Sequence, residues 1–509
     1  MNLLPSHSRR DARQGFALLA VLVFIMLLSM LTVSLMFRSK SDETAAAAGA
    51  GTEQAWAAAM SGVQEALRVA ASATPGSIEW QDNPAGFRDR PVFEDGADQW
   101  FFTVYSPTGS DDTVELRYGL DSEASRLNLN HPGSADLGRI PRMTPAMVQA
   151  VRSFVGAGTG TSSDTASAGQ ASATPPPIPA EGDLAALEPV PSGEDTLGAA
   201  IAALSLPVRH GPLSTLEDVL RVPGFSWSLL HGEDANLNGH LDANEDDGDE
   251  RFPPDNHDGR LDHGMAQYFS VVSYDPDRTS QGRRRTNLND PKEPLPSGEF
   301  PAGFTNFVAA MRAAGQKLAH PADLLEAKIK VKDSAGNEVE LGSGITKTEL
   351  PTVLDLFTTD TAGRHDGLID VNTASSTVLA TLPGIDPAIA ETIVSTRTSV
   401  SASRRTTTAW LVQEGVVDAE KFKALAPSIT ARSRQFRFQV LGYGIPSGRF
   451  CVLQAVVDAG GDEPRVIELR DITRLGLPFK PGPENTGTDS GTKQTAMKFA
   501  PFQRGGRRG

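Results

Sequence analysis

Residues 16–37 read FALLAVLVFIMLLSMLTVSLMF, a run of 22 residues without a charged side chain. As a helix rising about 1.5 Å per residue, this run would be roughly 33 Å long, enough to cross a bilayer once. Arg38 and Lys40 close the run, and the chain that follows is soluble in composition. We therefore expect a large domain attached to one membrane-spanning helix.

The residues before this run are polar and basic. Residues 1–15 contain Arg9, Arg10 and Arg13 against a single acid, and this charge favours a cytoplasmic N-terminus. A secretory signal has a shorter apolar region, followed by a small-residue cleavage site. Here the small residue, Gly15, precedes the apolar run. Two interpretations fit. One is a plain signal anchor. The other is a leader, residues 1–15, that resembles those of type IV prepilins, and this resemblance implies cleavage between Gly15 and Phe16.

The chain stays helical in pattern after the apolar run. Residues 43–71 are rich in alanine and place larger apolar side chains, such as Trp56 and Leu67, at three- and four-residue steps. Gly49 and Gly51 weaken the pattern near the membrane exit. We expect one helix over residues 16–72 that is both anchor and spine, and a coiled-coil stalk is the alternative.

Composition limits the possible classes of protein. A chain of 509 residues is too long for one compact core, so several domains are expected. The net charge of −16 argues against a general nucleic-acid binder, which needs positive charge to displace counterions. Cys451 is the single cysteine, so an internal disulfide is excluded.

Three short phrases resemble one another but are not evenly spaced. They are Leu127–Asn130 (LNLN), Thr286–Asn289 (TNLN) and Ile369–Asn372 (IDVN). Their uneven spacing argues against a solenoid. Alternating or apolar runs predict further strands. These runs cover residues 100–105, 113–120, 435–444, 449–458 and 464–470.

The most specific local motif is the acidic stretch DANLNGHLDANE, residues 234–245. It fits the calcium-loop template, with oxygen ligands at alternate positions and Gly239 at the sharp bend. The alternative is an acidic surface loop that binds nothing. The predicted ligands are Asp234, Asn236, Asn238, the carbonyl of His240, Asp242 acting through water, and Glu245.

A second, weaker copy follows the first loop. Asn256, Asp258 and Asp262 match the template, but Pro254 and Met265 occupy its two anchoring positions. Residues 233–262 contain eleven acidic side chains against two arginines, a density of charge that repels itself unless a cation neutralises it. We therefore predict that calcium binds and stabilises this region.

The third motif lies near residue 384. Pro383, Gly384 and Ile385 form a turn between two helical runs, a pattern that resembles a helix-hairpin-helix. Such hairpins can present backbone N–H groups to DNA phosphates. Asp386 and Glu391 weigh against this here, although the nearby bases Arg397, Arg404 and Arg405 keep the local charge from being hostile. No nucleophile, base or phosphate-loop pattern emerges, so we expect that the protein is not an enzyme.

Taken in order, these features resemble the general secretion pathway protein K family, the large minor pseudopilins of type II secretion. Most pilins carry glutamate at the fifth position of the mature chain, where this sequence has Ala20. The resemblance implies an α+β fold, with a type IV pilin-like N-terminal helix packed on a small antiparallel sheet. It also implies a large, mainly helical insertion of the helix-hairpin-helix or SAM-like type, and bound calcium.

The same resemblance implies a cellular role. A prepilin peptidase would cut after Gly15, and the chain would sit in the inner membrane as a single-pass protein with its bulk in the periplasm. It would join minor pseudopilins of the I and J types at the filament tip and initiate assembly for protein export. The rival hypothesis is a membrane-anchored DNA receptor that uses the 383–385 hairpin.

These expectations divide the chain into segments. The expected segments are 1–15 leader, 16–72 helix, 73–130 first part of the α/β domain, 131–232 helical insertion with a disordered linker at 156–199, 233–264 calcium region, 265–367 strands and helices, 368–430 helix-hairpin-helix domain, 431–478 antiparallel strands and 479–509 disordered tail.

Overall fold

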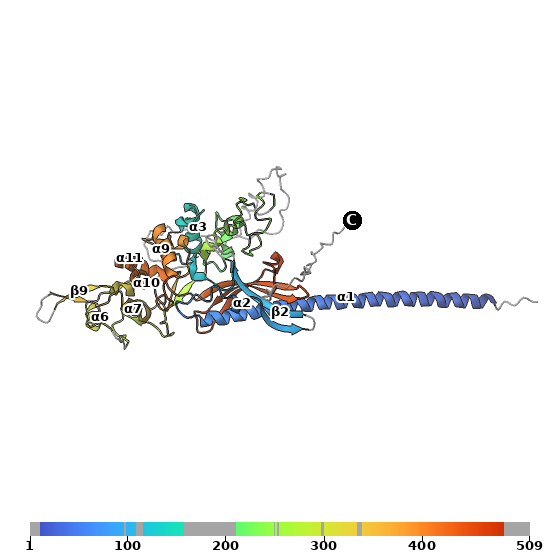
Figure 1. The fold of residues 1–509 in the computed structure, drawn as a ribbon, viewed down its shortest axis with the longest axis horizontal. Helices are drawn as coiled ribbons and strands as arrows, with labels where there is room; N and C mark the ends of the chain where they lie inside the picture. Colours follow the sequence, from blue (N-terminus) through green and yellow to red (C-terminus); the bar gives the residue numbers. More distant parts are fainter. Residues whose placement is uncertain are drawn as a thin grey trace, which may run out of the picture.

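The computed structural model describes residues 11–95, 98–107, 116–156, 210–248, 250–251, 254–296, 300–332 and 338–482. Most of the predicted leader, nearly all of the predicted linker and most of the predicted tail lie outside these ranges. The longest element is α1, Asp11–Ser72, whose 62 residues form the blue rod that projects from the rest of the molecule in Figure 1.

The outer half of α1 meets no other part of the described chain. From Leu18 to Phe37, its large apolar side chains are 45% to 74% exposed. This is the described helix whose length and hydropathy would allow it to cross a membrane. The predicted N-terminal apolar helix is therefore confirmed, and it is consistent with single-pass anchoring.

The inner half of α1 lies flat on a sheet, and small side chains allow the close approach. Ala55, Ala59 and Ala66 are fully buried against it. On the facing strand, a Cβ added to Gly442 would lie 2.4 Å from the backbone oxygen of Ala55 and 2.4 Å from the backbone nitrogen of Ala59. The alanine-rich sequence therefore produces a helix–sheet contact with almost no space between the backbones.

The main sheet is antiparallel, in the order β1-β2-β15-β16-β17, with β3 paired to β2 and β4 to β15. Along β2, Phe102 and Val104 face α1, whereas Phe101 and Tyr105 belong to a core on the opposite face. The strands expected near residues 100, 435, 449 and 464 are confirmed. The bounds are β1 Arg90–Asp95, β2 Asp98–Pro107, β3 Leu116–Arg117, β4 Asp121–Ser122, β15 Gln435–Ile445, β16 Phe450–Asp458 and β17 Arg465–Asp471, with α2 Pro84–Phe87 before β1.

Between β4 and β15 the chain leaves the sheet and forms a large insertion of short helices, to the left of and above the sheet in Figure 1. The helix α6 ends at Ala313, and Gly315 follows with φ +68°. The α-helices of the insertion are α3 Pro145–Gly156, α5 Trp227–His231, α6 Phe304–Ala313, α7 Leu350–Leu356, α8 Ser376–Leu379, α9 Pro387–Arg397, α10 Trp410–Gln413 and α11 Ala419–Leu425.

Single 3₁₀ turns and small strand pairs complete the described chain. The 3₁₀ turns are η1 Glu123–Ser125, η2 Leu137–Arg139, η3 Leu216–Arg221, η4 Ala266–Tyr268, η5 Pro321–Leu324, η6 Ala426–Ser428 and η7 Thr473–Leu475. The strand pairs are β5 Leu127–Asn128 with β6 Phe269–Ser270, β7 Tyr274–Pro276 with β12 Arg364–Asp366, β8 Thr286–Asn287 with β11 Phe357–Thr358, β9 Lys328–Lys332 with β10 Glu338–Gly342, and β13 Ile369–Asp370 with β14 Ile429–Thr430.

The three similar phrases of the sequence are equivalent in structure. Each forms a short parallel pair, β5 with β6, β8 with β11, and β13 with β14. The asparagine that ends each phrase then joins two distant segments through its side chain. We call this arrangement an asparagine clasp; its three residues are Asn130, Asn289 and Asn372.

The hydrogen bonds of the clasps correspond one to one. The Asn130 amide donates to the carbonyls of Leu213 and Val271, both at 2.9 Å. Asn289 and Asn372 likewise each donate to two carbonyls. The Oδ1 of Asn130 and of Asn289 accepts from a backbone N–H, whereas that of Asn372 accepts from the Trp410 indole at 3.2 Å. One local device therefore stabilises the insertion at three places.

Candidate metal-binding loops and helix-hairpin-helix

The predicted cleavage point lies within the first turns of α1. Gly15 and Phe16 follow Asp11, the first residue of the helix, and residues 1–10 of the leader lie outside the described ranges. Ala20 lies on the exposed apolar half of α1. The peptide bond after Gly15 is therefore flanked by helix on both sides, and leader removal stays a prediction.

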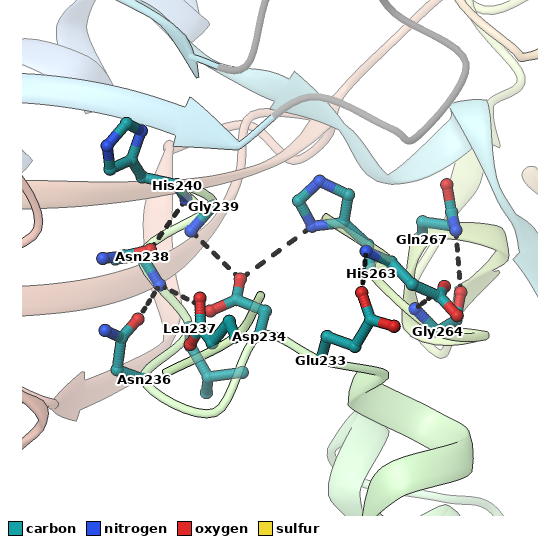
Figure 2. A network of polar contacts seen from close by, with 12 residues as sticks. Glu233, Asp234, Asn236, Leu237, Asn238, Gly239, His240, His263, Gly264 and Gln267 are labelled. Atoms are coloured by element: carbon teal, nitrogen blue, oxygen red, sulfur yellow. Dashed lines mark hydrogen bonds and ion pairs between the residues drawn. The ribbon is translucent and has the colours of Figure 1, made fainter. Parts of the chain in front are cut away.

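The first acidic loop folds around its own side chains. Asp234 accepts hydrogen bonds from the amides of Asn238 and Gly239, both at 3.0 Å, as Figure 2 shows. Asn238 in turn accepts from the amide of His240 at 2.7 Å. Gly239 has φ +70°, and an added Cβ would lie 2.4 Å from Pro107, so this bend requires glycine.

Glu245 closes the first loop with both carboxylate oxygens. It accepts from the amide of Ala235 at 3.0 Å and from the amide of Asp242 at 3.2 Å. The Asp242 carboxylate accepts from the side-chain amides of Asn236, at 2.6 Å, and Asn238. Five of the six predicted ligands thus gather their side chains in one loop, and the His240 carbonyl belongs to its backbone.

Burial makes the charges of this loop costly. Asp234 and Glu245 are only 5% and 1% exposed. Burial, together with the nearby Glu245, raises the pKa of Asp234 to about 7, and burial also raises the pKa of Glu245. The nearest histidine nitrogen, Nδ1 of His263, is 3.9 Å from the Asp234 carboxylate (Figure 2). The hard carboxylate and amide oxygens of this loop fit a calcium ion. The ion would also supply the positive charge that the two carboxyl groups with raised pKa values lack.

The second loop is closed by the carboxylate of Glu233, which lies directly before the first loop. Glu233 accepts from the amide of Asn256 at 3.2 Å and from the amide of Asp262 at 3.1 Å, so it spans the second loop as Glu245 spans the first. Sequence reasoning missed Glu233, because the template places the closing acid after the loop, where Met265 stands. Its only signal was its position directly before Asp234.

The other predicted residues of the second loop have competing partners. Arg142 forms an ion pair with Asp262 at 2.5 Å, so one oxygen already faces a cation. Asp258 accepts from the amide of Arg260, and Asn256 from the amide of Asp258, both at 2.9 Å. These bonds fix the turn but leave the second loop a weaker ligand set than the first.

A group of three side chains joins the two loops. Asp246, Asp255 and His257 bring one ligand atom each to within 4.8 Å of one another. Asp255 accepts from the amides of Asp247 and Gly248, both at 2.9 Å. His257 is exposed and its Nδ1 lies 2.5 Å from the carbonyl of Asp246. Through these hydrogen bonds, the three residues link the first loop to the second.

The predicted hairpin is formed by α8, the turn at Pro383–Ile385, and α9. Gly384 has φ +75° and is exposed, whereas Ile385 is buried in the insertion core. Asp386 caps α9 by accepting from the amide of Ile389 at 2.8 Å. The turn is therefore built as the sequence predicts.

Arg139 holds this hairpin from behind. Its guanidinium donates to the carbonyls of Ala380, at 2.6 Å, and Ile385, at 2.9 Å. On the outer side, Asp386 and Glu391 are exposed. The face that a phosphate would approach is therefore acidic, and the guanidinium of Arg139 is already bound to backbone carbonyls of the hairpin.

Comparison with known protein families matches residues 365–406 to the helix-hairpin-helix motif. The match covers the third clasp, the hairpin and α9, and it confirms the motif predicted from the sequence. It covers a small part of the 509-residue chain and identifies a motif. Comparison with curated proteins returned no match.

Proposed function

We propose that this chain is a minor pseudopilin at the tip of a type II secretion pseudopilus, where it initiates the filament that exports proteins across the outer membrane. The observation that carries the proposal is α1, whose exposed apolar half continues without a break into a half that packs on an antiparallel sheet. A helix of this kind can sit in the inner membrane and later pack among the helices of partner subunits.

Two features favour a place at the tip. Ala20 offers no carboxylate to the amine of a neighbouring subunit, so this chain needs no subunit above it. The insertion adds a large body beside the sheet, and its bulk would block further addition on that side (Figure 1). The partners would be minor pseudopilins of the I and J types, and a prepilin peptidase would remove the leader.

Leader removal is tested by replacing Gly15 with leucine in cells that carry a prepilin peptidase. We expect wild-type protein to begin at Phe16 and Gly15→Leu to keep all fifteen leader residues, as read by mass spectrometry of the N-terminus. Gln14→Leu adds a similar side chain one position earlier and should still be cut. Cleavage of Gly15→Leu at the same bond would refute the prepilin assignment.

The tip role is tested by purifying the full chain from membranes with tagged I- and J-type pseudopilins. We expect the three to elute together from a sizing column. Failure to associate, combined with normal leader removal, would leave a prepilin-class protein but reject the tip assignment.

We also infer that the first acidic loop binds calcium and that Glu233 completes a weaker second loop. Calcium should raise the melting temperature of the full chain in detergent, because a ligand that binds only the folded state stabilises it by about 2.7 kcal/mol at one hundred times its Kd. Glu245→Gln should remove most of the shift. Glu420→Gln, which removes an exposed carboxylate paired with Lys423, is the matched control. Equal melting in calcium and chelator would reject the site.

DNA binding is the second candidate, because the matched motif occurs in DNA-binding proteins. The acidic outer face of this hairpin, with Asp386 and Glu391, and the net charge of −16 argue against it. A gel shift with duplex DNA that weakens steeply with salt would favour this candidate over the pseudopilin proposal.

A further inference from the structure

A cavity of about 490 Å³ lies where the sheet, the first acidic loop, the third clasp and the helix-hairpin-helix region meet. Its walls come from the ends of β2 and β15, from η3 and α5, and from the segment between β13 and α9. Pockets of this volume commonly hold small organic molecules. Asp234 and Leu237 of the first acidic loop also line this space, which the pseudopilin proposal does not use.

The walls of the cavity carry an unusual number of unpartnered polar atoms. Buried polar atoms are nearly always hydrogen-bonded, because an orphan costs about 1–3 kcal/mol. Within the described chain, five lining residues each have one buried side-chain atom without a hydrogen-bond partner. These atoms are Nη1 of Arg126, Nε2 of His231, Oγ1 of Thr373, Nε of Arg405 and Oε1 of Gln439.

Arg405 is the most informative of the five. It is only 8% exposed, and no carboxylate in the described chain forms an ion pair with it. Other arginines of the cavity wall are paired: Arg126 with Asp121 and Arg437 with Glu123. A buried charge without a counter-ion is strongly unfavourable. The position of Arg405 therefore favours a negative charge supplied from outside the described residues.

The backbone of Arg405 is fixed independently of its side chain. Its carbonyl accepts from the Asn372 clasp at 3.0 Å, and its amide donates to the carbonyl of Ser401 at 3.1 Å. Gly76 packs against the same segment, since an added Cβ would lie 3.0 Å from the Arg405 carbonyl carbon. The guanidinium is thus held at the wall by the third clasp and the loop after α1.

Two further lining residues, Gln439 and His231, offer polar groups. Gln439 is 3% exposed, and its amide nitrogen is already used by the carbonyl of Leu237 at 2.7 Å, so its oxygen is left as an acceptor. His231 is 6% exposed, and its Nε2 has no hydrogen-bond partner in the described chain. These groups would match hydroxyl or amine donors on a ligand.

We propose that this cavity binds a small organic anion, a carboxylate or phosphate ester that also carries hydroxyl or amine donors. Its anionic group lies on the guanidinium of Arg405, and its donors face Gln439 and His231. Such a ligand would bridge the sheet and the insertion and hold the two in one arrangement. The proposal does not depend on leader cleavage, and because the predicted calcium ligand Asp234 also lines the cavity, the test leaves calcium out.

The test uses the full chain in detergent, without added calcium and at constant ionic strength. The probes are glycerol 3-phosphate and glycerate, which differ in the anionic group, and inorganic phosphate, which lacks the hydroxyl donors. We expect a saturable rise in the melting temperature of several degrees with one of the two organic probes. Inorganic phosphate should give a smaller rise.

Variants decide whether Arg405 carries the response. Arg405→Met should abolish it and should leave the melting temperature of the protein without probe unchanged or higher, because a buried unpaired charge is removed. Arg405→Lys keeps the charge but loses the planar guanidinium, which can donate two parallel hydrogen bonds to one anion. It should weaken probe binding about tenfold. Arg404→Met, one residue earlier and paired with Glu414, is the matched control and should respond like wild type.

Three results would overturn the proposal. The first is no saturable response of the wild type to either organic probe. The second is an equal response in Arg405→Met. The third is a melting temperature of Arg405→Met several degrees below the wild type without probe, which would mean that the guanidinium already has a partner in the fold.

Discussion

The sheet with α1 and the insertion are held together by opposite kinds of contact. Against α1, the sheet presents Gly442 and apolar side chains such as Phe102 and Val104, and the backbones nearly touch. In the insertion, short elements are joined by buried asparagines that bridge distant carbonyls. The first interface should therefore be sensitive to added volume, and the second to the loss of polar atoms at constant volume.

The largest effect is expected where the two backbones meet. Gly442→Val adds a branched side chain where even a Cβ would lie 2.4 Å from backbone atoms of α1. We expect a loss of about 4 kcal/mol or more of unfolding free energy, because neither backbone can move aside. Chemical denaturation in detergent measures this loss. A loss below about 1 kcal/mol would mean that α1 is loosely seated.

A change that keeps the shape of the side chain should separate the two regions. Asn372→Leu keeps the branched shape and the number of side-chain heavy atoms but orphans the carbonyls of Arg405 and Ala431 and the indole of Trp410. We expect a loss of about 3 kcal/mol, since each orphaned buried group costs about 1–3 kcal/mol. The matched change in the sheet core, Leu453→Met, should cost less than about 1.5 kcal/mol. Equal losses in the same denaturation experiment would erase the contrast.

The phrase that carries the third clasp differs from the other two phrases at its second residue. Asp370 stands where the others have Asn128 and Asn287, and burial raises its pKa to about 6. A raised pKa means that the fold prefers the protonated acid. The stability contributed by Asp370 is therefore complete below about pH 4 and is lost as the pH rises through 6.

Asp370→Asn should remove this dependence and restore the residue of the other clasps. We expect the variant to gain about 2 kcal/mol relative to wild type between pH 4 and pH 7, one pKa unit being about 1.4 kcal/mol. Denaturation curves at several pH values give the difference. If the unfolding free energies of wild type and variant differed by the same amount at every pH in this range, Asp370 would already be ionised at low pH.

The smallest effect is expected on the exposed part of α1. A Cβ added to Gly49 meets nothing within 4 Å, so Gly49→Ala should stabilise the helix by about 0.5–1 kcal/mol. Gly51→Ala is the comparison variant and should not give this gain, because its added Cβ would lie 2.2 Å from the Arg449 side chain. Circular dichroism during thermal unfolding compares the two. A gain from both would show that Arg449 moves freely.

The sequence alone predicted the elements that depend on local pattern. The apolar run of α1, the strands near 435–471, the first acidic loop and the hairpin all follow from periodicity or from a template. The partners of these elements could not be predicted, because periodicity reports which face of an element is buried and not against what. The Asn130 clasp shows this: the phrase is visible, but its carbonyls lie 83 and 141 residues away.

The candidate sites divide in the same way. The predicted ligands of the first loop lie within twelve consecutive residues, so a template can propose them from the sequence alone. Glu233 serves the second loop from outside it, and its contacts with Asn256 and Asp262 cross 23 and 29 residues. Arg405 was visible only as a nearby base, because burial and the absence of a paired carboxylate exist only after folding.

The position of the insertion within the sheet also sets an order of events during synthesis. β2 and β15 are neighbours, and the backbone of Ser447 contacts Asp98, 349 residues earlier. At about 5–20 residues per second, roughly 20 to 70 seconds separate the emergence of these two strands from the ribosome. During that time the edge of β2 has no partner strand, while each clasp of the insertion can close as soon as its own segments have emerged. The strands β15 to β17, within residues 435–471, thus complete a sheet that the first hundred or so residues begin.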